Sequence, residues 1–174
     1  IPVIVDPKGT DFEKYCGATL LTPNRAEFEA VCGSWINEQD LVDKGLTLIN
    51  RLDIEAILVT RSEQGMTLIV RDGSAHQFAT MAREVADVTG AGDTVVAAIA
   101  AGLGAGISLA SSAELANQAA GIVVSKSGTA TVIGRELESA LSVDYSIFHS
   151  AEGLAAWADQ YRARGEKIVM TNGC

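Results

Sequence analysis

Two aspartates, Asp87 and Asp93, enclose the segment Val-Thr-Gly-Ala-Gly, and residues 95–102 that follow are all small or apolar. This pattern indicates a tight glycine-rich loop that leads into a buried helix, which we expect to cover residues 91–104. The first backbone amides of a helix point outward without intrahelical acceptors and carry partial positive charge. Because glycine lets a bound group approach these amides closely, the segment predicts an anion-binding site.

Asp93 stands where the predicted loop meets the helix, and two roles fit a carboxylate at that place. It can accept the proton of an alcohol that attacks the bound anion, as a general base does in phosphoryl transfer. It can instead act only as the N-cap of the helix, for which aspartate is a favoured residue. An isolated Gly-x-Gly would favour the N-cap, but the second aspartate and the flanking Thr89 and Thr94 make the match more specific.

Residues 87–102 resemble the C-terminal signature of the ribokinase (PfkB) family of carbohydrate kinases. The resemblance implies that Asp93 is the catalytic base. It also implies that three backbone amides form the anion hole for the transferred phosphoryl group, those of Gly90, Ala91 and Gly92. The implied substrates are ATP and a small sugar phosphate, with Mg²⁺ as the metal.

Asn24 and Glu27 fit a structural role and a functional one, and the loop between Asp87 and Asp93 downstream favours the functional one. Asparagine is a good N-cap, and glutamate three residues later completes a capping box. The resemblance assigns them instead to an Asn-x-x-Glu motif, in which Glu27 orients Mg²⁺ through water and Asn24 lies near the nucleotide phosphates. Mg²⁺ keeps several waters and needs few protein ligands, so one outer-sphere glutamate is enough. Lys8, which follows a predicted strand, is a further candidate for a phosphate contact.

Further nucleotide contacts are implied by the resemblance alone. A strand-turn-strand at residues 54–70 would lie over the ATP phosphates through Thr60, Ser62 and Gly65, although an ordinary polar turn also explains it. Asn117 matches a position near the adenine, and the alternative is a polar residue on a partly exposed helix face. In several relatives a monovalent cation such as K⁺ binds at the end of that helix, and the equivalents here are Asp87, Thr89 and Gly128.

Composition excludes several other classes of function. The 174 residues carry a formal net charge of −9 and no cluster of Lys and Arg, which argues against nucleic acid or an anionic membrane surface as partners. No apolar run is as long as the about 18 residues that a membrane-spanning helix needs. The three cysteines are widely spaced and form no Cys-x-x-Cys, so we expect reduced thiols in a cytoplasmic protein.

The expected fold class is α/β: the C-terminal part of a three-layer ribokinase-like sandwich with a mostly parallel sheet. Short apolar runs predict strands, and longer stretches with caps and apolar periodicity predict helices. The strands are expected at residues 1–5, 18–22, 54–60, 66–70 and 74–79. The helical segments are expected at residues 11–15, 24–31, 37–51, 91–104, 108–126 (interrupted at Gly121), 134–141 and 151–164.

The two ends of the sequence suggest a piece of a longer polypeptide. We expect residues 1–143 to belong to the kinase domain, 144–166 to form a linker and helix, and 167–174 to begin another strand. That last stretch resembles the opening of a cytidylyltransferase-like nucleotidyltransferase. The resemblance therefore points to a bacterial, bifunctional branch of the family, and we expect the complete protein to be a homodimer.

This branch phosphorylates heptose 7-phosphate at the anomeric hydroxyl, giving the 1,7-bisphosphate used for ADP-heptose and lipopolysaccharide. The alternatives are another sugar or sugar-phosphate kinase of the family, or a non-catalytic nucleotide-binding module on the same fold. Residues 1–174 alone are expected to be inactive, because the half that brings the sugar pocket is absent from them.

Overall fold

The computed structural model describes residues 1–81, 88–126, 128 and 130–142, with residues 154, 155, 158, 159, 162 and 168. The chain divides into two compact units, Ile1–Leu141 and Ser142–Cys174. The sheet, the helices that cover it and the candidate site all belong to the first unit. Of the predicted helix at 151–164 only residues 154, 155, 158, 159 and 162 are described, and of the predicted strand at 167–174 only residue 168.

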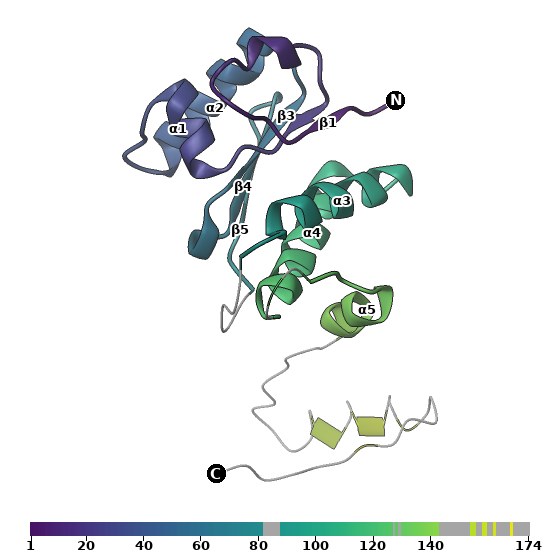
Figure 1. Cartoon of the computed structure of the whole chain (residues 1–174). Helices are drawn as coiled ribbons and strands as arrows, with labels where there is room; N and C mark the ends of the chain where they lie inside the picture. The colour runs from purple at the N-terminus through teal and green to yellow at the C-terminus, as the bar shows by residue number, and fades with distance from the viewer. Residues whose placement is uncertain are drawn as a thin grey trace. The chain divides into compact units, whose positions relative to one another are not determined.

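A five-stranded sheet forms the centre of the first unit, with the strands in sequence order (Figure 1). The first three strands are parallel, and the last three form two successive antiparallel pairs. The strands are β1 (Ile4–Val5), β2 (Leu20–Leu21), β3 (Ala56–Thr60), β4 (Met66–Val70) and β5 (Ala75–Phe78). Each begins within two residues of a strand predicted from the sequence, or inside it.

Helices cover both faces of this sheet, which confirms the α/β class and the layered architecture (Figure 1). One face packs against α1 (Arg25–Cys32) and α2 (Glu38–Leu52), and the other against α3 (Ala91–Gly104) and α4 (Leu109–Val124). The remaining described helices are α5 (Gly134–Ser142) and two short 3₁₀ turns, η1 (Glu13–Tyr15) and η2 (Ser62–Gln64).

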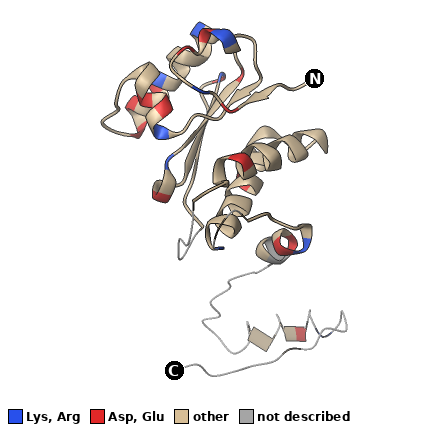
Figure 2. Cartoon of the chain, viewed as in Figure 1, with Lys and Arg blue, Asp and Glu red and all other residues tan. Residues whose placement is uncertain are grey.

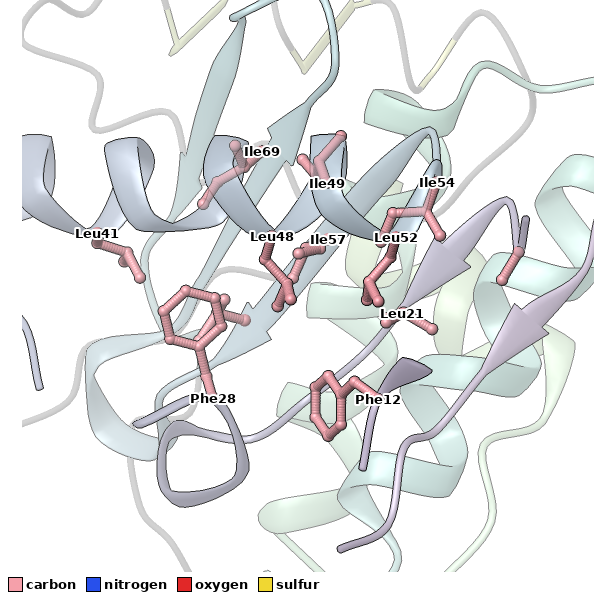
Figure 3. Close-up of a cluster of buried hydrophobic side chains, with 12 residues drawn as sticks. Phe12, Leu21, Phe28, Leu41, Leu48, Ile49, Leu52, Ile54, Ile57 and Ile69 are labelled. Carbon is pink, nitrogen blue, oxygen red and sulfur yellow. The ribbon is translucent and has the colours of Figure 1, made fainter. Parts of the chain in front are cut away.

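Alternation along β3 divides the buried side chains between two hydrophobic cores. Ile57 and Val59 point to the core beneath α1 and α2, whereas Ala56 and Leu58 point to the core beneath α3 and α4. Figure 3 shows the first core, in which the side chains of α2 meet those of the strands. Full burial of each such Leu, Ile or Phe contributes about 1.5–3 kcal/mol. The sheet is therefore held from both sides.

The two helices on the second face pack closely because small residues line them. A β-carbon placed on Gly102 of α3 would lie 2.5 Å from Oγ of Ser112 in α4. The bounds of α3 agree with the predicted helix at residues 91–104. The predicted interruption at Gly121 is wrong, since α4 continues to Val124. The cost of one glycine in a helix, about 1 kcal/mol relative to alanine, is outweighed here by tertiary packing.

Charged residues are unevenly distributed between the helices on the two faces of the sheet (Figure 2). Acidic and basic residues both occur on α1 and α2, while α3 and α4 carry very few of either. Asp93 is the only charged residue of α3, and it lies in the first turn. Among the described residues, no helix has the length and apolar character that a membrane span requires.

Candidate active site

The ends of the parallel strands and the start of α3 together form an open pocket of about 180 Å³. In open α/β sheets, ligands bind outside the carboxyl ends of the strands. Asp6 follows β1, Thr22 follows β2 and Thr60 ends β3, so each parallel strand delivers one polar side chain to this edge. The complete lining is Asp6, Lys8, Thr22, Asn24, Glu27, Thr60, Gly90, Gly92 and Asp93.

The start of α3 is shaped by Gly90, which is the N-cap and has the left-handed φ of 83°. Its carbonyl accepts hydrogen bonds from the amide and the hydroxyl of Thr94, at 3.0 and 2.9 Å. The amide of Ala91 donates to the carbonyl of Val88 at 3.2 Å. The next amides, of Gly92 and Asp93, have no acceptor within the helix. Of the three predicted anion-hole amides, that of Ala91 is thus engaged, whereas that of Gly92, which lines the pocket, is uncommitted to the helix.

Asp93 is the third residue of α3, exposed on the wall of the pocket. Because Gly90 occupies the N-cap, the N-cap role weighed for Asp93 from the sequence does not apply. A carboxylate in the first turn is favoured by the helix dipole. Asp93 therefore places a negatively charged carboxylate, which can accept a proton, beside the Gly92 amide, which can bind an anion.

Asn24 and Glu27 form the predicted capping box at the start of α1. The amide of Glu27 donates to Oδ1 of Asn24, and the amide of Asn24 donates to Oε2 of Glu27, both at 2.9 Å. The other carboxylate oxygen of Glu27 accepts a hydrogen bond from Nζ of Lys8 at 3.1 Å. Glu27 therefore has a structural role and still presents one oxygen, with a second lone pair, to the pocket.

Among the described residues, Lys8 is the only basic one that lines this pocket. Its Nζ lies 3.0 Å from Oδ2 of Asp6 and 3.1 Å from Oε1 of Glu27. The hydrogen bond to Asp6, followed by that to Glu27, raises the pKa of Lys8 above its ordinary value. The amide of Lys8 donates to the hydroxyl of Tyr15 at 3.1 Å, and this bond lowers the pKa of Tyr15. Lys8 thus keeps its positive charge between two carboxylates of the pocket.

The structure brings only part of the predicted nucleotide set to the pocket. Thr60 lines it, whereas Ser62 is exposed on η2 outside the lining. Gly65 is buried, and a β-carbon there would overlap the carbonyl oxygen of Phe78. Asn117 is 6% exposed and donates from Nδ2 to the carbonyl of Ala79 at 2.8 Å. Gly65 and Asn117 therefore each have a structural function beside β5.

The structure describes two of the three residues predicted to bind a monovalent cation. Asp87 lies outside the described residues, while Thr89 and Gly128 are described, the latter with a φ of 77°. Nearby, Nζ of Lys126 donates to the carbonyl of Thr131 at 2.8 Å and to Glu136 at 2.7 Å. In the described part of the chain, no group of three or more His, Cys, Asp or Glu side chains could hold a metal ion directly.

Sequence reasoning placed Asp6 at the ligand-binding edge of the sheet without giving it a role, and it missed Thr22. Both directly follow a strand of the parallel part of the sheet, and this position is the signal that could also have identified Thr22. Thr22 donates its hydroxyl to the carbonyl of Val5 at 3.3 Å, which ties the ends of β1 and β2 together. Asp6 holds Lys8, so both residues shape the pocket floor.

Comparison with known proteins agrees with this geometry. The sequence profile of the pfkB family carbohydrate kinase matches residues 1–134. The chain is 56% identical over 178 residues to bifunctional protein HldE of Pasteurella multocida, covering 100% of the chain and 37% of that protein. The corresponding protein of Aeromonas salmonicida is 55% identical, with the same coverage. The chain thus spans little more than a third of the length of these relatives.

Solved structures show the same fold. Arabidopsis thaliana ribokinase, complexed with ribose and ATP, superimposes with a TM-score of 0.73 at 25% identity, over 82% of this chain and 48% of that one. Phosphofructokinase-2 from Escherichia coli, in complex with potassium, gives a TM-score of 0.71 at 20% identity, over 80% of this chain and 46% of that one. The latter shows likeness of fold alone.

Proposed function

We infer that this chain, which belongs to the pfkB family of carbohydrate kinases, forms the nucleotide-binding and catalytic part of a sugar kinase. The proposed acceptor is heptose 7-phosphate, whose anomeric hydroxyl would receive the γ-phosphoryl group of ATP to give the 1,7-bisphosphate. The similarity to HldE proteins along the whole chain supports this branch of the family over other sugar kinases. The product would then serve ADP-heptose and lipopolysaccharide synthesis.

One observation carries the proposal: Asp93, the only charge on α3, lies on the pocket wall one residue after Gly92. In the proposed step, the sugar oxygen forms a bond to the γ-phosphorus while the bond from phosphorus to the ADP oxygen breaks. Asp93 takes the proton of the sugar hydroxyl. The Gly92 amide donates to a phosphoryl oxygen as charge develops there, and one such donor is worth about 2.7–4 kcal/mol in other enzymes.

The nucleotide and Mg²⁺ fit the donors of the pocket. Mg²⁺, when bound to the phosphates, supplies charge neutralisation and orientation of the transferred group. Glu27 would hold it through water, using the oxygen that also accepts from Lys8. Lys8, whose ammonium lies between Asp6 and Glu27, would turn to a phosphate oxygen. Asn24 and Thr60 would contact the phosphates from the same wall, and Ser62, Gly65 and Asn117 would complete the nucleotide contacts.

Three further features of the complete protein are proposed on the resemblance. A monovalent cation such as K⁺ would bind at Asp87, Thr89 and Gly128. Residues 1–143 would close the kinase domain, and residues 167–174, after the linker at 144–166, would open a nucleotidyltransferase domain. The complete protein would be a homodimer whose remaining kinase residues supply the sugar pocket, since the chain covers 37% of its relatives.

The test is a turnover assay of the complete protein with ATP, Mg²⁺ and a panel of sugars. ADP release should require heptose 7-phosphate, and nuclear magnetic resonance should place the new phosphate on the anomeric oxygen. Ribose and fructose 6-phosphate are the comparison substrates, because they stand for the other carbohydrate kinases of this fold. ATP binding without turnover of any sugar would support the non-catalytic module instead.

A further inference from the structure

We propose that Arg61 is a positioning residue for the nucleotide: it holds the turn η2, with Thr60 before it, in the conformation that receives ATP. The inference rests on the proposed function, in which residues 60–65 contact the phosphates. Arg61 itself does not line the pocket, so its role would be exerted through its neighbours. The sequence analysis gives no role to this side chain.

The burial of Arg61 is the first observation. Its side chain is 6% exposed, although it follows directly after a strand at the pocket edge. One guanidinium nitrogen donates to Oε1 of Glu38 and another to the carbonyl of Gln64 at 3.5 Å. Within the described part of the chain, its Nε has no hydrogen-bond partner. A buried cation adds little net stability, so stability alone gives a weak reason for this residue.

The network around Glu38 is the second observation. Glu38 is the first residue of α2, and its other oxygen accepts from Nε2 of Gln77 at 3.2 Å. Through Arg61, the carboxylate of Glu38 therefore links η2 to α2, which carries Glu38, and to β5, which carries Gln77. The planar guanidinium can donate to Glu38 and to the turn at once, which a lysine ammonium on a flexible stem would do less rigidly.

The backbone of the turn is the third observation. Ser62 has a φ of 52°, one of two left-handed residues other than glycine in the described chain, and Gly65 has a φ of 79°. The amide of Arg61 donates to the carbonyl of Gly65 at 2.8 Å, which closes the turn. Such a strained conformation persists when the surrounding structure enforces it, and strained segments cluster at ligand sites. The buried side chain of Arg61 is the group that holds the turn in this conformation.

The consequence concerns affinity for the nucleotide. Without the ion pair the turn would sample other conformations, and ATP would have to order it on binding. Binding of the sugar would be unaffected, since it engages other residues. Turnover at saturating ATP would be largely retained, because Asp93 and Gly92 lie on a different element. A purely structural role would instead lower the melting temperature and leave both Michaelis constants unchanged.

The experiment compares Arg61→Met and Glu38→Gln in the complete protein. Methionine keeps the length and apolar stem of Arg61 without its charge, and Glu38, which is 44% exposed, stays hydrated. Arg71→Met is the matched control, because Arg71 pairs with Asp53, the other left-handed residue, at 2.8 Å and away from the pocket lining. Calorimetry gives the dissociation constant of ATP·Mg²⁺, and initial rates give the Michaelis constant of each substrate.

We expect Arg61→Met and Glu38→Gln each to weaken ATP binding about tenfold, the scale of ordering a turn on binding, with little change for the sugar or for kcat. Arg71→Met should bind ATP as the wild type does. Unchanged ATP binding in Glu38→Gln, or an equal loss in Arg71→Met, would overturn the inference. A wild-type protein that binds no ATP would contradict the proposed function itself, so the two failures are distinguishable.

Discussion

Replacement of Gly92 by alanine should stabilise the protein and at the same time nearly abolish its kinase activity. Gly92 is the second residue of α3, and its backbone is not left-handed. A β-carbon built on it meets no atom within 4 Å. Nothing within the described fold therefore requires glycine at this position, whereas the Gly92 amide is the proposed donor to the transferred phosphoryl group.

The substitution should raise the free energy of unfolding slightly and lower kcat strongly, so the two effects can be measured separately. Alanine is favoured over glycine in a helix by about 0.5–1 kcal/mol. In a domain of 150–250 residues 1 kcal/mol raises the melting temperature by about 2–4 °C, and in the longer kinase domain of the complete protein the rise should be smaller. A methyl group on the pocket wall, however, would keep the phosphoryl oxygen from the amide. Loss of one such donor lowers kcat by about 10²–10³-fold in other enzymes.

Gly104→Ala is the control, because Gly104 is the last residue of the same helix and its β-carbon would also meet nothing within 4 Å. Both variants are compared by thermal unfolding and by ATP-dependent turnover of heptose 7-phosphate. Gly104→Ala should gain stability and keep full activity. If Gly92→Ala were as active as Gly104→Ala, the phosphoryl group would not approach this amide and the proposed anion hole would be wrong.

Three other predictions concern the metal, the packing and the isolated chain. Glu27→Gln should raise the Mg²⁺ concentration for half-maximal rate with little loss of stability, since glutamine also completes a capping box; an unchanged Mg²⁺ dependence would leave Glu27 a cap only. Gly102→Ala should destabilise by about 1–3 kcal/mol in denaturant titrations, through overpacking against Ser112; unaltered stability would contradict the close helix contact. Residues 1–174 alone should bind ATP·Mg²⁺ in calorimetry without phosphorylating heptose 7-phosphate; robust turnover would place the sugar pocket within this chain.

The elements that the sequence predicts well are those with local signals. The helix at residues 91–104 has its glycine loop and its apolar run, and the structure gives the same bounds. Asn24 is predicted as a cap, and its side chain accepts from the amide three residues later, as does that of Asn37 at the start of the predicted helix 37–51. Caps depend on contacts within one turn, so they can be read from neighbouring residues.

The features that could not be predicted depend on distant partners. The burial of Arg61 follows from its meeting Glu38, 23 positions earlier, which no local pattern announces. The bond from Asn117 to the carbonyl of Ala79 likewise joins α4 to the chain after β5. Only three-dimensional packing brings such partners together.

The catalytic role of Asp93 is the central claim, and Asp93→Asn in the complete protein tests it most directly. The substitution keeps the size of the side chain and removes its basicity. Calorimetry should give wild-type ATP·Mg²⁺ binding, and thermal unfolding should be close to that of the wild type, because Asp93 is exposed and is not the N-cap. Turnover of heptose 7-phosphate should fall by about 10²–10⁴-fold, the usual contribution of a general base. Turnover near the wild-type rate, with ATP binding intact, would contradict the mechanism.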